Sequence, residues 1–231
     1  SVWYSAPLPP LPDIMASPAP ATKPALPGRP KDMAKRAAIL EAASKLFVQH
    51  GFSGVSIDQI AAEAGVSKLT VYSHFGDQDG LFIAAVRAHC EQGMPTNLFE
   101  PDPNQPLRER LTTIAHAFLA MVMAPEAIAG HRVLCSPQVA DSSLSTMIWD
   151  AGPKRVNEAF TALLERRIAA GELDIDDPAR AARHFFTLLK GDLHARAVLG
   201  GCCGGNSGCA DSVETHITSV VDLFLRAYAQ R

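Results

Sequence analysis

The 231-residue sequence has no excess of basic residues, because 21 Lys and Arg stand against 24 Asp and Glu, for a net charge of −3 at pH 7. A strongly basic chain is therefore excluded, and any case for nucleic-acid binding must rest on local charge. From residue 81 onward the sequence has no runs that alternate polar and apolar residues, so strands are not predicted there. Hydrophobic residues make up 47% of the chain, which is ample material for buried helical cores.

Sequence motifs of enzymes are missing as well. The chain has no glycine-rich phosphate loop, no nucleophile elbow, and no Ser/His/Asp set that the expected helices would bring together. We therefore predict no catalytic residues and no cofactor. The eight histidines include no pair with HxxxH-type spacing beside a pair of cysteines; His116 with His131, and His184 with His194, both lack it. No metal site is predicted.

The number of cysteines is odd, at five, and the first residues lack the basic and apolar regions of a signal peptide. Both features indicate a reducing compartment, so the expected location is the cytoplasm, without membrane association. Cys90 and Cys135 are predicted to be small core residues. Cys202, Cys203 and Cys209 lie in the segment GGCCGGNSGC, where thiols either sense oxidants or only occupy a permissive loop.

What the chain does contain is a helix-turn-helix pattern in SIDQIAAEAGVSKLTVYSHF, residues 56–75. Ser56 and Gln59 have the spacing of a capping box at the start of one helix. Gly65 suits the positive φ at which that helix ends, and Ser67 is a good N-cap for a second helix. A glycine in the turn, small residues at the crossing and a polar outer face on the second helix are what a DNA-binding helix-turn-helix requires.

The outer face of the second helix carries one cation, hydroxyls, a phenol ring and an imidazole. This mixture suits phosphates and base edges in a major groove. The side chains concerned are Lys68, Thr70, Tyr72, Ser73 and His74. On these residues alone, the alternative is an ordinary helical hairpin whose polar face only meets water.

Together with the residues before it, the pattern reads AILEAASKLFVQHGFSGVSIDQIAAEAGVSKLTVYSHFGDQDGLF. This stretch closely resembles the TetR family of bacterial transcriptional regulators, over about Arg29 to Val86. The resemblance implies an all-α protein of about nine helices, with an N-terminal three-helix helix-turn-helix domain and a C-terminal helical domain for ligand binding and dimerisation. The DNA-binding residues that it implies are Arg29, Lys31, Ser67, Lys68, Leu69, Thr70, Tyr72, Ser73, His74 and Gln78.

The sequence departs from the family pattern at two of these positions. Gln78 stands where the family usually has a lysine that contacts phosphate, and the neighbouring Asp77 and Asp79 disfavour phosphate binding at that helix start. Leu69 stands where a glycine is frequent, and it either meets a thymine methyl or packs. These departures leave open a helical ligand-binding protein with a weakened DNA-binding face.

The predicted organisation is a proline-rich disordered tail at residues 1–28, the DNA-binding domain at 29–78 and a second helical domain at 79–231. In the second domain, apolar spacing predicts one helix that ends near residue 92 and another that begins at 107. Further helices are predicted at about 126–136, 139–150, 153–170, 178–199 and 211–231.

The residues from HRVLCSPQ to HFFTLLKG also resemble the C-terminal domain of AefR-like regulators. The family resemblance implies a homodimer through the last two helices and a pocket in the second domain. An aromatic and methionine-rich lining favours an apolar or amphipathic small molecule, although apolar residues at helical spacing are also typical of a plain core. The expected ligand-binding residues are His116, Phe118, Met121, Val122, Trp149, Phe160, Phe186 and Leu189.

The sequence therefore favours a ligand-responsive homodimeric regulator, a repressor that binds a palindromic operator in double-stranded DNA and is released by a small effector. Two alternatives remain open. One is a regulator that responds to thiol oxidation or to a protein partner, and the other is the ligand-binding protein with a weakened DNA-binding face.

Overall fold

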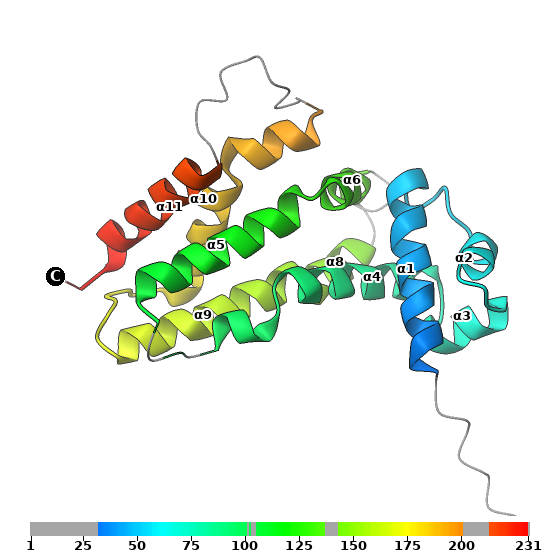
Figure 1. Ribbon diagram of the computed structural model, residues 1–231, viewed down its shortest axis with the longest axis horizontal. Helices are drawn as coiled ribbons and strands as arrows, with labels where there is room; N and C mark the ends of the chain where they lie inside the picture. The colour runs from blue at the N-terminus through cyan, green and yellow to red at the C-terminus, as the bar shows by residue number, and fades with distance from the viewer. Residues whose placement is uncertain (1–31, 101, 103–104, 137–142, 201–212, 231) are drawn as a thin grey trace, which may run out of the picture. The chain divides into compact units, whose positions relative to one another are not determined.

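The computed structural model describes residues 32–100, 102, 105–136, 143–200 and 213–230. Helices form nearly all of the regular structure in these ranges, where the one β-type pairing is a bridge between Leu173 and Ala229. The predicted all-α fold is confirmed. The predicted tail and the three cysteines of the GGCCGGNSGC segment lie outside the described residues. Figure 1 shows α1, α2 and α3 at one end, with the longer helices of a bundle extending away from them.

Local sequence signals set the limits of the first three helices. These helices are α1 (Met33–His50), α2 (Ile57–Glu63) and α3 (Lys68–Phe75). At the start of α2, the Ser56 hydroxyl accepts from the backbone N–H of Gln59, while the Gln59 side chain accepts from the backbone N–H of Ser56. The predicted capping box is therefore present.

A first hydrophobic core holds these helices together. It also includes α4 (Gln78–Gly93) and, from much later in the chain, Leu144 and Ile148 of α8 (Ser143–Ala151). The aromatic ring of Phe47 meets that of Phe82 edge to face, with 5.0 Å between the ring centroids. The buried members of this core are Ile39, Ala42, Ala43, Phe47, Val55, Ile57, Ile60, Ala61, Val71, Leu81, Phe82, Leu144 and Ile148.

The remaining helices form the second part of the molecule (Figure 1). They are η1 (Thr96–Phe99, a 3-10 turn), α5 (Leu107–Met123), α6 (Pro125–Leu134), α9 (Pro153–Ala169), α10 (Pro178–Val198) and α11 (Val213–Tyr228). Most of their bounds match the predicted spans within a few residues. The 3-10 turn was not predicted, because its segment contains prolines and no helical repeat.

The second core lies between α5, α9, α10 and α11 and is rich in aromatic rings. Phe160, Phe185, Phe186 and Phe224 are all buried. The ring centroids of Phe160 and Phe185 are 4.9 Å apart, and those of Phe185 and Phe224 are 5.2 Å apart. Each such pair contributes about 0.5–1.5 kcal/mol beyond the burial of its area, so this cluster gives the bundle a rigid centre.

α10 contains a break that the sequence did not predict. Gly191 has φ 46° and ψ −148°, inside a helix that is otherwise continuous in the chain. Only glycine adopts such a conformation without strain. Next to the break, Nε2–H of His216 on α11 donates to the backbone carbonyl of Leu189, with 2.9 Å between the atoms. The break is thus supported by the neighbouring helix.

Beyond the break, the end of α10 is attached to α6. The Arg132 guanidinium donates from Nε to the carbonyl of Val198 at 2.7 Å and from Nη2 to the carbonyl of Ala197 at 2.8 Å. These carbonyls are among the last of α10, and that of Ala197 also accepts from the backbone N–H of Gly200 at 3.2 Å. The cation adds a partner to each and complements the helix dipole. α6 and the end of α10 are therefore positioned together.

Two further predictions concern single residues and membrane spans. Cys90 is buried, as predicted, but the prediction for Cys135 was wrong, because it is the exposed C-cap of α6. Within the described ranges, no single helix has the length and apolar composition of a membrane span. α5 and α6 have that length and composition only when they are taken together, and the two helices are bent by 66° relative to each other.

Candidate nucleic-acid interface and ligand cavity

The outward side of α3 carries most of the side chains expected to contact DNA. Val71 faces the first core and is buried. On the opposite side, Leu69 is 77% exposed and Tyr72 is 41% exposed. Lys68 and Ser73 are exposed as well. α3 therefore presents a mixed polar and apolar surface to solvent, anchored through a single buried valine.

Hydrogen bonds fix the orientation of the small hydroxyls on α3. The N-cap hydroxyl of Ser67 lies 2.8 Å from Oγ1 of Thr70 and accepts from the Thr70 backbone N–H at 3.2 Å. The hydroxyl of Ser73 donates to the carbonyl of Thr70 at 2.8 Å. Because that bond uses the Ser73 proton, the free capacity of this hydroxyl is as an acceptor.

The cation on α3 has a partner within the protein. Nζ of Lys68 lies 2.8 Å from Oδ2 of Asp58 on α2. This ion pair raises the pKa of the Lys68 ammonium, first through the hydrogen bond and then through the charge of the carboxylate. Both side chains are exposed, so the pair contributes little to stability, and it holds Lys68 beside α2.

Gln78 is placed differently from a phosphate contact. Its amide Nε2 donates to the backbone carbonyls of Phe52 and Val55, at 2.8 and 3.0 Å. Both of its donor hydrogens are therefore used within the protein, and only the acceptor oxygen remains, which phosphate does not attract. Gln78 joins the start of α4 to the loop between α1 and α2. Among the described residues, Nδ1 of His74 is buried and has no hydrogen-bond partner. Arg29 and Lys31 lie outside the described residues.

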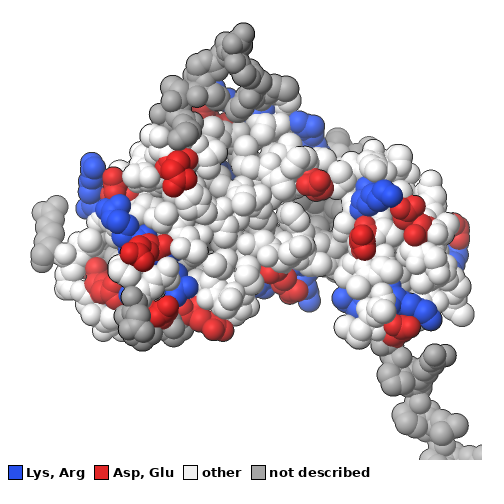
Figure 2. Space-filling view, viewed as in Figure 1, with Lys and Arg blue, Asp and Glu red and all other residues white. Residues whose placement is uncertain are grey.

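Charge on this part of the molecule is mixed. On the face shown in Figure 2, blue and red atoms are mixed at the end where Figure 1 places α1, α2 and α3, and white atoms predominate over the middle of the molecule. This pattern agrees with the small net charge of the chain. Binding to DNA would then depend on the shape and hydrogen bonding of α3 as well as on charge.

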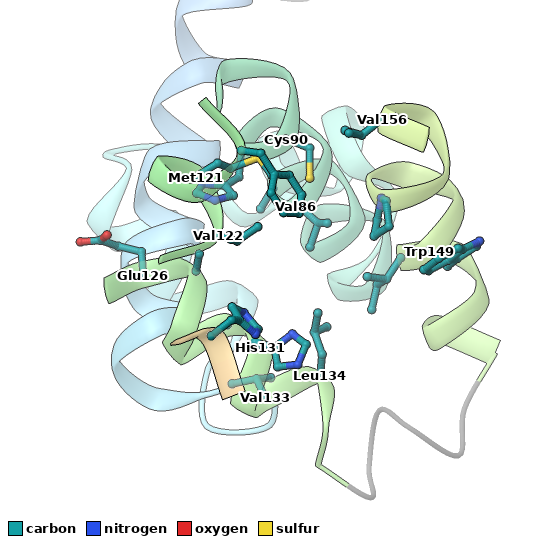
Figure 3. A pocket seen from close by; sticks show the side chains of 18 of the residues that line it. Val86, Cys90, Met121, Val122, Glu126, His131, Val133, Leu134, Trp149 and Val156 are labelled. Atoms are coloured by element: carbon teal, nitrogen blue, oxygen red, sulfur yellow. The ribbon is translucent and has the colours of Figure 1, made fainter. Parts of the chain in front are cut away.

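The second site is a cavity of about 440 Å³ between the two cores. This volume falls in the range of roughly 300–1,000 Å³ that is usual for small-molecule pockets. Ser44, Phe47 and Val48 of α1 form one side. The other walls come from α4, α5, α6, α8, α9 and α10. Figure 3 shows Val86, Met121 and Val122 around the open space, which is largely apolar.

Five of the eight residues expected to bind ligand line this cavity. They are Phe118, Met121, Val122, Trp149 and Phe186. Trp149 lies at the edge, is 51% exposed, and points away from the open space in Figure 3.

The other three lie elsewhere. Phe160 and Leu189 are fully buried in the second core and do not line the cavity. His116 lies near the surface, with Nε2 3.2 Å from Oε1 of Glu214 on α11.

The polar side chains of the cavity were not expected from the sequence. They include His89 and Cys90 of α4, His131 of α6, and Lys190 and His194 of α10. The imidazoles of His131 and His194 meet edge to face, with 4.9 Å between the ring centroids. A polar residue inside an apolar helical repeat, such as the lysine in LLKGDL, is the sequence signal that would have indicated these positions.

Burial changes the pKa values of this polar group. It lowers the pKa of the Lys190 ammonium and raises that of the Cys90 thiol. Burial is also the main reason that the pKa of His194 falls to about 4, and the charges of Lys190 and His131 lower it further. The pKa of His131 is lowered by burial and by Lys190. Both imidazoles are therefore neutral at pH 7. The described ranges contain no cluster of three or more His, Cys, Asp or Glu that could hold a metal ion.

Comparison with known proteins agrees with this arrangement. Residues 39–85 match the family model of bacterial regulatory proteins of the tetR family. Residues 109–230, more than half of the chain, match the C-terminal domain of AefR-like transcriptional repressors. The chain belongs to the TetR family. It is thus a TetR-family transcriptional regulator with a DNA-binding helix-turn-helix and an AefR-like helical domain.

Individual TetR relatives match over most of the chain. The transcriptional repressor AcnR of Corynebacterium glutamicum is 24% identical, over 78% of this chain and 90% of AcnR. The solved structure of the flavonoid-responsive regulator FrrA is 30% identical, with a TM-score of 0.68, over 87% of this chain and all of FrrA. A putative TetR-family regulator from Mesorhizobium loti is 25% identical, with a TM-score of 0.70 and the same coverage.

Proposed function

We propose that this TetR-family regulator is a repressor that binds a palindromic operator as a homodimer and is released by a small apolar or amphipathic effector. The similarity to AcnR, which is named a repressor, and to FrrA, which is named flavonoid-responsive, supports both halves of the proposal. The predicted domains, with DNA binding before residue 79 and ligand binding after it, remain part of the proposal.

The observation that carries the proposal is that α1 forms a wall of the cavity. Phe47 belongs to the first core, which supports α3, and it also lines the cavity. Val133 of α6 lines the same cavity and lies 3.9 Å from the position of a Cβ on Gly51, at the end of α1. A ligand in the cavity therefore contacts the same helix that positions α3. Suppose that the ligand binds more tightly when α1 holds α3 in an orientation that does not fit the operator. By linkage, the free energy of operator binding is then weakened by the same difference, typically ~1–3 kcal/mol.

α3 is the proposed reading element. Lys68 and Tyr72 would contact phosphates, and Thr70 and Ser73 would read bases. Because the Ser73 hydroxyl is left as an acceptor, it suits the amino groups of adenine N6 or cytosine N4. The exposed Leu69 side chain suits a thymine methyl group. Gln78, with its donors used, would act by holding α4 in place and not by touching phosphate.

Exposed apolar side chains on the last two helices support dimerisation. Leu188 of α10, its C-cap Leu199, and Val213 and Leu223 of α11 are all exposed in the single chain. A two-fold axis along α10 and α11 would bury these residues in a four-helix interface. The same axis would place two copies of α3 on successive major grooves of one duplex face.

The test is selection of bound sequences from a random DNA pool, at two salt concentrations, with the wild type and Tyr72→Ala. The matched control is Asn97→Ala, which changes an exposed residue in the second part of the molecule. We expect the wild type and the control to enrich one two-fold-symmetric site, and Tyr72→Ala to lose it. The selected site then serves to screen effectors for release of the protein.

Two outcomes would contradict the proposal. Enrichment of no site at low salt would favour the ligand-binding protein with a weakened DNA-binding face. Release of the operator by oxidants alone, which Ser replacements of Cys202, Cys203 and Cys209 abolish, would favour a thiol sensor.

A further inference from the structure

The cavity has cationic side chains in a largely apolar lining. Arg183, Lys190 and His194 of α10 all line the cavity. Arg183 and Lys190 are seven residues apart and share a face of the helix before the break, and His194 follows the break at Gly191. Valine, methionine and phenylalanine side chains of α4 and α5 supply much of the apolar lining. The lining therefore combines cationic and apolar side chains.

Lys190 brings a charge to the cavity without a carboxylate to neutralise it. The influences on its ammonium are burial and the Cys90 thiol, and no Asp or Glu raises its pKa. Among the described residues that line the cavity, Glu126 is the one acidic residue. Its side chain is exposed, and in Figure 3 it points away from the open space. A half-buried ammonium loses part of its hydration, and here no carboxylate compensates for that loss. The negative charge of an anionic ligand would offset this desolvation penalty.

A second polar atom is available on the facing helix. Nε2 of His89 on α4 is buried and has no hydrogen-bond partner among the described residues, and His89 lines the cavity. Buried polar atoms usually have partners. The neutral imidazoles of His131 and His194 add further sites that donate or accept. The cavity thus offers the cationic side chains of Arg183 and Lys190 and several neutral hydrogen-bonding groups around a largely apolar space.

We infer that the effector is an amphipathic organic anion, with its acidic group on Lys190 and its apolar body against α4 and α5. This inference rests on the proposed function of the cavity as an effector site. The shared chemistry is a carboxylate, a sulfonate or an ionised phenol attached to an alkyl or aromatic body. Because α10 bonds to α6 through Arg132, an anion held on Lys190 also acts on the helix that adjoins α1.

Two fluorescent probes that differ by a single group test the inference on the full chain. 1-Anilinonaphthalene-8-sulfonate carries one anionic group on an aromatic body, and N-phenyl-1-naphthylamine is the same body without it. Three variants are compared with the wild type. Lys190→Met removes the charge at similar length, Lys190→Arg keeps the charge, and Lys154→Met removes an exposed lysine outside the cavity.

We expect Lys190→Met to weaken binding of the sulfonate probe by about tenfold, as loss of a hydrogen bond to a charged group does. Binding of the neutral probe should stay within about twofold. Lys190→Arg should retain most of the affinity for the sulfonate, and Lys154→Met should bind both probes like the wild type. Val122→Trp, which fills the cavity, should abolish binding of both probes.

The failure of this inference differs from failure of the proposed function. If Lys190→Met binds the sulfonate as well as the wild type does, the inference is overturned, while release of the operator by the neutral probe would still support the proposed function. If Val122→Trp leaves binding of both probes unchanged, the cavity is not the ligand site and both proposals fail.

If Lys190→Met does not fold, the pH dependence of probe binding to the wild type still tests the inference. Above pH 7 the imidazoles of His131 and His194 have no charge to lose, because their pKa values are lowered, and burial raises the pKa of the Cys90 thiol. Burial lowers the pKa of the Lys190 ammonium, so its positive charge is lost as the pH rises. Affinity for the sulfonate should fall with rising pH and that for the neutral probe should not, and parallel profiles would overturn the inference.

Discussion

At the scale of single residues, the imidazole of His194 makes the stability of the protein depend on pH. Its pKa of about 4 in the folded chain lies below the ordinary value of 6.5, because burial and the charge of Lys190 oppose protonation. The unfolded chain therefore binds the proton more readily than the folded chain. The contribution to stability is complete above pH 6.5 and is lost as the pH falls toward 4.

The prediction is that His194→Gln makes unfolding less sensitive to acid. From pH 7 to pH 4, the free energy of unfolding of the wild type should fall by about 2–3 kcal/mol more than that of the variant, from a shift of this size. Urea denaturation at several pH values measures the difference. His184→Gln, an exposed histidine of the same helix, is the control and should follow the wild type. Identical profiles for His194→Gln and the wild type would contradict the argument.

Gln78 gives a second prediction at this scale. Gln78→Ala removes both donors to the carbonyls of Phe52 and Val55 and leaves two partly buried acceptors without a partner. The free energy of unfolding should fall by about 1–3 kcal/mol, as measured by chemical denaturation. Asp79→Ala changes the exposed neighbour and should have little effect. A Gln78→Ala protein of unchanged stability that had only lost DNA affinity would instead indicate a direct phosphate contact.

At the scale of helices, the break in α10 decides which residues face the cavity. Lys190 lies directly before Gly191, and His194 lies one turn after it. A continuous helix would direct the last turns of α10 elsewhere and would separate them from α6. The break therefore brings the imidazole of His194 next to that of His131.

Replacement of Gly191 by Ala tests the importance of the break. The φ of 46° and ψ of −148° strain any residue with a Cβ, and the new atom would lie 3.4 Å from Cε1 of His216. We expect the free energy of unfolding to fall by about 1–3 kcal/mol. In Gly130→Ala the new Cβ meets no atom within 4 Å and the backbone is helical, so this control should be neutral or slightly stabilising. Equal denaturation midpoints for the two variants would refute the expectation.

At the scale of the whole molecule, exposed leucine on α11 predicts how two copies associate. Leu223 is 52% exposed in the single chain. Leu223→Glu would place a charge from each copy in the proposed four-helix interface, where burial without a partner is costly. We expect sedimentation equilibrium to give a dimer for the wild type and a monomer for the variant, which would also lose the palindromic site. Gln92→Glu, an exposed change on α4, should remain dimeric. If Leu223→Glu remains dimeric, the dimer interface does not contain Leu223, which would contradict the proposed four-helix interface.

The parts that could be predicted from sequence are those set by neighbours in the chain. Ser56, Gln59 and Gly65 determine α2 and its turn through bonds that span only a few residues, so the helix-turn-helix was evident. The grouping of polar side chains in the cavity could not be predicted in this way. Cys90, His131 and Lys190 come from three helices that are distant in the sequence. Lys190 stands out as a polar residue in LLKGDL, but no local pattern shows that the three side chains meet. Their meeting depends on the packing of α4, α6 and α10 and on the break at Gly191.

The position of α4 and α8 has a consequence for how the chain unfolds. Leu81 at the start of α4 belongs to the first core and Met94 just after its end belongs to the second, while Leu144 of α8 completes the first core. Neither core is formed by one uninterrupted stretch of the chain. Loss of either core removes the support of α4 from the other, so the two should melt in a single cooperative transition. A fragment that ends at residue 78 would lack part of the first core. The helices α1, α2 and α3 are therefore not expected to fold as an independent domain.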